Sequence, residues 1–335
     1  MGEGAGRLGH SPARQVAATR ALAAALLAAG AFAAGLACAH APAPGPAAAA
    51  AAASPIDPGA HFRFVDVAAD AGLARVYLAG RPGKDHLLDS AGSGVAFLDY
   101  DRDGRLDIFL PNGWRLDGDR IVERGRAALY RGRPDGRFDD VTDAAGVGGE
   151  GVWGGGAAAA DFDGDGWTDL LLTGFGPIVL YRNRGDGRFE NVAPRLGLDA
   201  SGWNTAASWF DADGDGDLDL YVAAYIDCTL ADILKARPTL NWKGVEKVAF
   251  GPFGMTGAPD HFFRQEAGRF VDATAASGFA DLALGFGFAT RTGDFDGDGD
   301  LDLYVANDSD PNYLYLNDGT GHFHEAGTTS LSAFD

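Results

Sequence analysis

Residues 294–302 read DFDGDGDLD, with five aspartates in nine positions. Carboxylates this close repel one another, by up to roughly 4 kcal/mol for a pair about 4 Å apart near a protein surface. The pattern D-x-D-x-D-G-x-x-D nevertheless occurs four times, beginning at Asp99, Asp161, Asp211 and Asp294. A repulsive arrangement that recurs in register indicates that each copy binds something of opposite charge.

Each copy has carboxylates at positions one, three, five and nine, a glycine at position six and a backbone carbonyl at position seven. Hard oxygen ligands around a sharp glycine turn suit Ca²⁺, which takes about six to eight of them. The loops contain none of the thiols or imidazoles that zinc or copper prefers. The sequence therefore predicts about four Ca²⁺ sites. The predicted ligands are Asp99, Asp101, Asp103, Asp107 and the Arg105 carbonyl; Asp161, Asp163, Asp165, Asp169 and the Trp167 carbonyl; Asp211, Asp213, Asp215, Asp219 and the Asp217 carbonyl; and Asp294, Asp296, Asp298, Asp302 and the Asp300 carbonyl.

An EF-hand loop begins in the same way and has to be excluded. EF-hands carry a bidentate Glu at position twelve and are flanked by helices. In this chain position twelve is Leu110, Leu172, Val222 and Val305, each within an apolar β-prone run. The EF-hand interpretation therefore fails at all four loops.

A second repeated element alternates with the acidic loops. Its copies are RFVDVAADAGL (63–73), RFDDVTDAAGV (137–147), RFENVAPRLGL (188–198), RFVDATAASGF (269–279) and HFHEAGTTSL (322–331). Small-residue runs such as GGGAAAA lead into the loops, alternating apolar strands such as LDLYVA leave them, and Gly-containing hairpin turns follow.

Units of this kind favour an all-β fold, a β-propeller, with the small-residue strands near its axis. A β-solenoid is the rival all-β arrangement, but the units are too long for its coils. The predicted propeller covers residues 61–335, with units around 61–147, 148–198, 199–279 and 280–335.

The first sixty residues are predicted to lie outside this fold. Arg14 and Arg20 precede the uncharged run 21–37, which is typical of an export signal over residues 1–39. Cleavage after Ala39 or Ala41 would release a secreted protein. GLAC (35–38) alternatively resembles a lipoprotein box, which would anchor the chain through a lipid on Cys38. Residues 40–60 form an Ala/Pro-rich linker. Both interpretations place the mature protein outside the cytoplasm.

The charge balance limits the partners. The formal net charge of −20 argues against nucleic acid and against direct binding to an anionic bilayer. Any membrane attachment is expected only through Cys38. The expected partner is an extracellular protein or glycan.

The quoted motifs resemble FG-GAP/VCBS repeats, the calcium-loop blades also found in integrin α-chain propellers. More narrowly, the chain is similar to exported proteins related to cartilage acidic protein and the ASPIC/UnbV group. The resemblance rests on residues 89–113, 204–227 and 285–318 and on WKG and GPFGMTGAPD within 242–260. It implies a Ca²⁺-binding propeller outside the cytoplasm that serves binding or adhesion rather than catalysis.

Two departures from that family bear on the fold. Relatives often have a cysteine where this chain has Phe250, so a cross-link there is not expected. Relatives also continue through further blades and often an ASPIC/UnbV domain. Four loops predict an incomplete propeller, either a partial product or one completed by a partner, with an open strand edge that favours aggregation.

Two classes of function remain open at this point. The first is a non-catalytic binding module whose specificity element is the insert 227–260, although this insert could instead only plug the propeller mouth. The second is a calcium-dependent propeller polysaccharide lyase or another carbohydrate-active enzyme. No nucleophile elbow, zinc motif or phosphate loop is present, and single residues such as His86 or His261 do not define a base. The sequence therefore predicts a binding protein rather than an enzyme.

Overall fold

The computed structural model describes residues 64–80, 86–90, 92–149, 151–235, 239–242, 245–249, 251–252, 254–279 and 285–327. The predicted signal 1–39, the linker 40–60, Cys38 and parts of the insert lie outside the described residues. No helix in the part that is described is long and apolar enough to cross a membrane.

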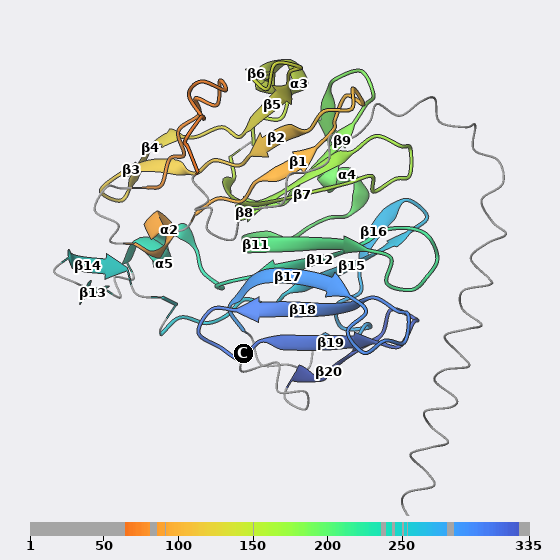
Figure 1. Ribbon diagram of the computed structural model, residues 1–335. Helices are drawn as coiled ribbons and strands as arrows, with labels where there is room; N and C mark the ends of the chain where they lie inside the picture. The colour runs from red at the N-terminus through yellow and green to blue at the C-terminus, as the bar shows by residue number, and fades with distance from the viewer. Residues whose placement is uncertain are drawn as a thin grey trace, which may run out of the picture. The chain divides into compact units, whose positions relative to one another are not determined.

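The body of the chain is built from four-stranded antiparallel blades that follow one another in sequence (Figure 1). The second and third blades also pair with each other, residues 175–177 with 201–203, so their strands form one eight-stranded sheet. Blade one consists of β1 (Ala96–Leu98), β2 (Asp107–Leu110), β5 (Ala128–Gly132) and β6 (Phe138–Asp140). Blade two consists of β7 (Trp153–Ala160), β8 (Asp169–Pro177), β9 (Val179–Asn183) and β10 (Phe189–Asn191). Blade three consists of β11 (Ser201–Phe210), β12 (Asp219–Ala224), β15 (His261–Glu266) and β16 (Arg269–Asp272). Blade four consists of β17 (Gly287–Gly293), β18 (Asp302–Asn307), β19 (Tyr313–Asn317) and β20 (Phe323–Glu325). This arrangement confirms the predicted fold, an incomplete β-propeller.

Two segments interrupt the four-strand pattern. Blade one contains an extra hairpin of β3 (Trp114–Asp117) and β4 (Arg120–Arg124) between β2 and β5. Blade three contains the insert, with α5 (Leu230–Lys235), β13 (Thr239–Trp242) and β14 (Val245–Ala249). Both lie at the ends of the strands that are opposite the acidic loops.

The first strand of each blade lies near the axis, and its small residues allow close approach to the neighbouring blade. Gly94 N–H donates to the Gly155 carbonyl at 2.7 Å, which joins the inner segments of blades one and two. A Cβ at Gly156 would lie 2.5 Å from the Thr205 carbonyl oxygen of β11. Glycine and alanine in these strands are therefore required by the packing of the blades, as the sequence indicated.

The second strands of blades one to three depart from the sequence expectation. Alternating burial was expected, but every residue of β12 is buried, as are most of those in β2 and β8. A neighbouring blade covers each face of β8 and β12, and on β2 the residues before blade one take the place of a blade, with Leu73 packed near Ile108. Both sets of side chains therefore enter a hydrophobic core.

The second repeated element supplies an aromatic ring to each interface between blades. Its phenylalanine enters the core shared with the preceding blade at Phe189, Phe270 and Phe323. After blades one and two the element ends in the one-turn helices α3 (Thr142–Ala145) and α4 (Ala193–Leu196), each closed by a left-handed glycine. A Cβ at Gly197 would lie 2.6 Å from the Phe270 carbonyl of the next blade, so only glycine fits there.

A matching contact precedes blade one. The Phe138 N–H donates to the Ala71 carbonyl at 2.8 Å, and a Cβ at Gly72 would lie 2.7 Å from the Phe138 carbonyl. Residues 65–73 therefore contact blade one in the way that the end of one blade contacts the next.

The opposite ends of the strands carry an aromatic cluster. Trp114, Trp153, Trp203 and Tyr225 pack there with Ile233 and Leu234 of α5 and with α2 (Leu87–Ser90). The short helix of the insert thus buries apolar side chains against the blades.

Candidate functional site

The four acidic loops occupy one equivalent place, the connection from the first to the second strand of each blade. Positions four and six both have left-handed backbone in every loop. Position six is always glycine, which adopts this conformation without strain. Position four is Gly164, Gly214 and Gly297 in three loops but Arg102, with φ of 59°, in the first.

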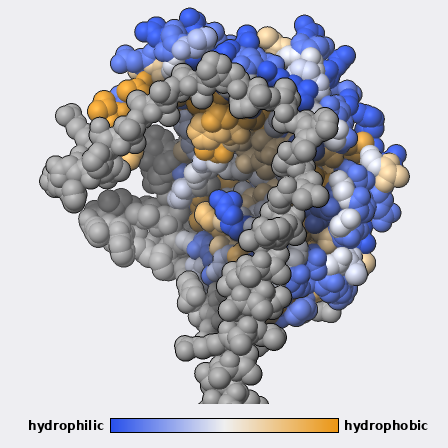
Figure 2. All heavy atoms as spheres, turned by 45° about the vertical axis from the view of Figure 1, so that its right-hand side comes forward, coloured by the Kyte–Doolittle hydropathy of each residue, from blue (hydrophilic) through white to orange (hydrophobic). Residues whose placement is uncertain are grey.

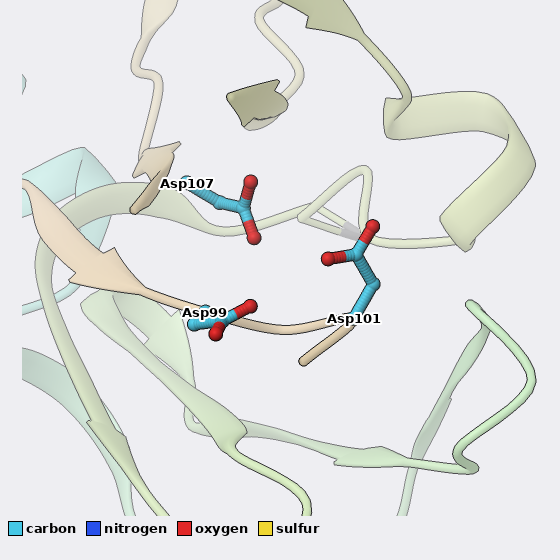
Figure 3. Close-up of side chains that lie close together, drawn as sticks. All are labelled: Asp99, Asp101 and Asp107. Carbon is cyan, nitrogen blue, oxygen red and sulfur yellow. The ribbon is translucent and has the colours of Figure 1, made fainter. Parts of the chain in front are cut away.

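The carboxylates of each loop converge. In every loop, oxygens from three aspartates lie within 4.8 Å of one another. Figure 3 shows the first group, in which Asp99, Asp101 and Asp107 point toward a shared space from the end of β1 and the start of β2. The groups are Asp99, Asp101 and Asp107; Asp161, Asp163 and Asp169; Asp211, Asp213 and Asp215; and Asp294, Asp296 and Asp302.

The remaining predicted carboxylates lie outside these groups. They are Asp103, Asp165 and Asp298 at position five and Asp219 at position nine. At position five one oxygen is engaged in a tight turn within the loop: Asp165 Oδ1 accepts the Trp167 N–H at 2.9 Å, and Asp298 Oδ1 accepts the Asp300 N–H at 3.0 Å. The same hydrogen bond joins Asp103 to Arg105 and Asp215 to Asp217. It therefore fixes the backbone of the position-seven residue in all four loops, and the carbonyls of these residues were the predicted ligands.

The aspartate at position nine also connects two segments of its blade through hydrogen bonds. Asp302 Oδ2 accepts the Phe295 N–H at 2.7 Å, and its Oδ1 accepts the Asn317 N–H of β19 at 2.9 Å. Asp107, Asp169 and Asp219 make the same pair of bonds in their own blades. All four side chains are buried. Each therefore joins the start of its loop to the third strand of its blade.

Burial also affects the acidity of these groups. It raises the pKa of Asp169 to about 7 and that of Asp219 to about 6, although the two backbone N–H bonds oppose the shift. Burial raises the pKa of Asp107 as well. A buried carboxylate near other carboxylates is costly to ionise unless a cation lies close to it.

An amide side chain on the third strand, which the sequence analysis missed, connects neighbouring blades. Asn317 Nδ2 donates to the Ala212 carbonyl in the loop of blade three at 2.8 Å. Asn183 donates in the same way to the Tyr100 carbonyl at 2.8 Å, and Gln265 to the Phe162 carbonyl at 3.1 Å. The equivalent residue of blade one is Gly132. The acidic loops are thus part of the interfaces between blades.

The donor set fits a hard divalent cation. All of the converging atoms are oxygens, which Ca²⁺ prefers. Two of the loop oxygens, Asp161 Oδ1 and Asp213 Oδ1, are buried and have no hydrogen-bond partner among the described residues. Because a buried polar atom without a partner is costly, a ligand at these oxygens would lower the free energy of the folded state.

Two hollows lie away from the loops. One, of about 540 Å³, lies between the inner strands, and its titratable lining residues in the described chain are Arg291 and Tyr304. The other, of about 470 Å³, is lined by Trp203, Cys228 and His261. Burial raises the pKa of the Cys228 thiol to about 12 and lowers that of His261. The surface in Figure 2 is largely hydrophilic, with a hydrophobic patch inside a hollow.

One family profile matches the repeats of this chain. The family profile of the FG-GAP-like repeat matches residues 120–172, 161–222 and 294–335, which contain the second, third and fourth loops. The chain therefore contains FG-GAP-like repeats, which form propeller blades. No curated protein matches the chain.

Several solved structures are distantly similar. A lectin of Agrocybe aegerita that recognises non-reducing terminal N-acetylglucosamine is 18% identical, with 72% of this chain and 51% of that chain covered and a TM-score of 0.36. The V. cholerae biofilm matrix protein Bap1 is 16% identical, with 73% and 41% covered and a TM-score of 0.30. The Bacillus licheniformis rhamnogalacturonan lyase is 14% identical, with 70% and 41% covered and a TM-score of 0.30. The chain thus spans about half or less of the length of these proteins.

Proposed function

We propose that the chain is an exported, calcium-binding repeat protein that acts as a non-catalytic binding or adhesion module. The observation that carries the proposal is the convergence of three carboxylates in each of four equivalent loops. The buried, unpartnered oxygens of Asp161 and Asp213 support it. A bound Ca²⁺ would offset the negative charge of the clustered carboxylates in each loop.

The aspartates that would hold the cation come from different segments of each blade. The aspartates at positions one and three come from the loop, and the aspartate at position nine begins the second strand. In loops one, two and four a cation held by all three would join the first and second strands of the blade, whereas in loop three the converging aspartates are those at positions one, three and five. Asn183, Gln265 and Asn317 contact the loops of the preceding blades at the same place. Occupied loops would therefore stabilise both the blades and their interfaces.

Thermal melting with calcium and with a chelator tests the calcium sites. An ion at about one hundred times its dissociation constant stabilises by about 2.7 kcal/mol per site, so the midpoint should rise by several degrees with calcium. Asp161→Asn should reduce the calcium-dependent increase, whereas Asp186→Asn, in the exposed β9–β10 turn, should preserve it. An unchanged midpoint in the wild-type protein would refute the proposal.

The finer family assignment and the location are part of the same proposal. We infer that the chain is a relative of cartilage acidic protein and the ASPIC/UnbV group, and that it is secreted or anchored through Cys38. Mass spectrometry of the mature protein distinguishes these two outcomes, because a lipid on Cys38 adds a fixed mass to the N-terminal peptide. An N-terminus at Met1 in protein from the native host would contradict export.

The proposed ligand is an extracellular protein or glycan, and nucleic acid is disfavoured by the acidic charge. The insert helix α5 buries Ile233 and Leu234, which supports a structural part for at least this end of the insert. Glycan arrays and protein pull-downs with calcium present should show binding without turnover. New ultraviolet absorbance from a uronate-containing polysaccharide would instead identify a lyase.

A further inference from the structure

One strand position distinguishes the four loops. On the third strand of each blade, one backbone N–H donates to the position-nine aspartate; the donors are Gly132, Asn183, Gln265 and Asn317. The position in question is the residue just before each of these donors. In blades one to three it is arginine, namely Arg131, Arg182 and Arg264, whereas in blade four it is Leu316. The hydrogen bond to the aspartate fixes the equivalence of these positions independently of any sequence alignment.

The arginines contact the acidic loops to different extents. Arg131 pairs with Asp101 at 2.5 Å and with Asp103 at 3.2 Å. Arg182 pairs with Asp163 and, at 2.7 Å, with Asp165. Loops one and two thus have a guanidinium that bridges positions three and five, which is the strong, geometrically specific form of such a pair.

Loop three has a weaker contact, and loop four has none. Arg264 lies 3.5 Å from Asp213, and its Nη2 donates to the Thr320 and Gly321 carbonyls of blade four instead. Throughout the described chain no arginine or lysine forms an ion pair with the five aspartates of residues 294–302. Loop four is therefore the loop with the least internal compensation of its charge.

A fixed guanidinium has two effects on a neighbouring cation. It occupies one oxygen of the aspartates at positions three and five, and its own charge repels an incoming ion. It also holds these carboxylates in place when no ion is bound. A loop with a bridging arginine should therefore bind a cation more weakly and keep its conformation without one, while a loop that lacks the arginine should do the opposite.

We propose that this arginine position sets the calcium dependence of each loop. This inference rests on the proposed function. Loop four binds calcium most tightly and requires it most, loop three is intermediate, and loops one and two are held by their own guanidinium groups. The protein thus has one cation-responsive blade, the fourth, on a row of blades that are less dependent on calcium.

Calcium titration by calorimetry on the full mature protein tests this ranking. The wild-type protein should show one site per chain that is tighter than the rest. Leu316→Arg should weaken that site by at least about tenfold, the effect expected for a unit positive charge about 5 Å from a divalent cation even at a dielectric close to that of water. The matched variant Leu316→Met should change it by less than about twofold, because Met fills a similar volume without charge. Arg182 and Arg264 are half-buried like Leu316, so the position accommodates an arginine.

The reciprocal variant and a local readout complete the test. Arg182→Met should add a second tight site, provided that circular dichroism shows a folded protein. In hydrogen exchange, peptides that span residues 294–302 should lose more protection on chelation than those that span residues 99–107. Four equivalent sites, or Leu316→Arg and Leu316→Met behaving alike, would overturn the inference and leave the proposed function intact. The absence of calcium binding at every loop would overturn both.

Discussion

The covered faces of the blades differ sharply from the exposed face of blade four. At position two of the loop, Tyr100, Phe162 and Ala212 are 6%, 4% and 2% exposed, whereas Phe295 is 51% exposed. The first three are covered by the phenylalanine of the next blade; Tyr100 and Phe189, for example, have ring centroids 6.0 Å apart. Their carbonyls also accept the amide of that next blade.

This difference shows what a blade needs from its successor. The successor supplies an aromatic ring for the core and one amide donor for the loop backbone. Blade four has the corresponding acceptor face, with Phe295 more than half exposed. Exposed apolar faces of this kind favour association.

The largest expected effect comes from removing the covered ring. Phe162→Ala should lower the free energy of unfolding by about 3–5 kcal/mol, because it leaves a cavity beside Phe270 and Trp209. Phe295→Ala should change it by less than about 0.5 kcal/mol, because its side chain is half exposed. Urea unfolding measures both, and sedimentation should show less self-association for Phe295→Ala. Equal losses of stability would mean that the two faces are equivalent.

A buried carboxyl at the interface of blades three and four should give a pH dependence. Asp260 accepts hydrogen bonds from Tyr221 Oη and Ala224 N–H, both at 2.6 Å, and burial raises its pKa to about 6. The folded pKa lies above the unfolded value of about 3.9, so the folded state binds this proton more tightly. The proton on Asp260 therefore stabilises the folded state fully below about pH 4. As the pH rises through about 6 this contribution is lost, and the free energy of unfolding falls by up to about 3 kcal/mol.

The variant Asp260→Asn isolates this group from the many other carboxylates. Between pH 4 and pH 7 the wild-type protein should lose stability relative to the variant, measured by urea unfolding at each pH. A difference between the two proteins that stays constant with pH would show that Asp260 does not titrate in this range.

Removal of the amide donor should have an intermediate effect. Asn317→Ala leaves the Ala212 and Leu301 carbonyls without their side-chain donor, at an expected cost of about 1–3 kcal/mol. Asn317→Asp keeps the shape but replaces the donor with an acceptor, so it should cost at least as much. A fully stable Asn317→Asp protein would show that the amide does not connect the blades.

The smallest expected effect concerns Arg102. Its left-handed backbone costs about 1 kcal/mol relative to glycine, while its guanidinium lies 4.9 Å from the Trp167 ring of blade two, a contact worth about 0.5–1 kcal/mol. Arg102→Gly should therefore change the stability by less than about 0.5 kcal/mol. In a Trp167→Leu background the same substitution should become stabilising, by up to about 1 kcal/mol. If Arg102→Gly is not stabilising in the Trp167→Leu background, the contact between Arg102 and Trp167 does not offset the backbone strain at Arg102.

The sequence predicted the blades and the loops for identifiable reasons. Each loop is specified within nine residues, and the strands beside it repeat the same pattern, so local information is sufficient. The small residues of β7 likewise indicated a crowded inner strand, which the approach of Gly156 to Thr205 explains.

The contacts between blades could not be predicted in this way. Asn183, Gln265 and Asn317 bond to carbonyls 83, 103 and 105 residues away, and their identities differ. The burial of both faces of β12 depends on neighbours on each side. A signal was present, however, because three of the five RF or HF repeats supply the ring at an interface between blades, namely Phe189, Phe270 and Phe323.

The position of the amide gives the row of blades a direction. Each donor belongs to the later blade and its acceptor to the earlier one, and blade one has Gly132 where a donor would be. A ribosome makes the earlier blade first, and nascent domains generally fold from the N-terminus. Blades two, three and four each carry the donor that fastens them to the blade made before them, so no blade depends on a later one for a donor of its own.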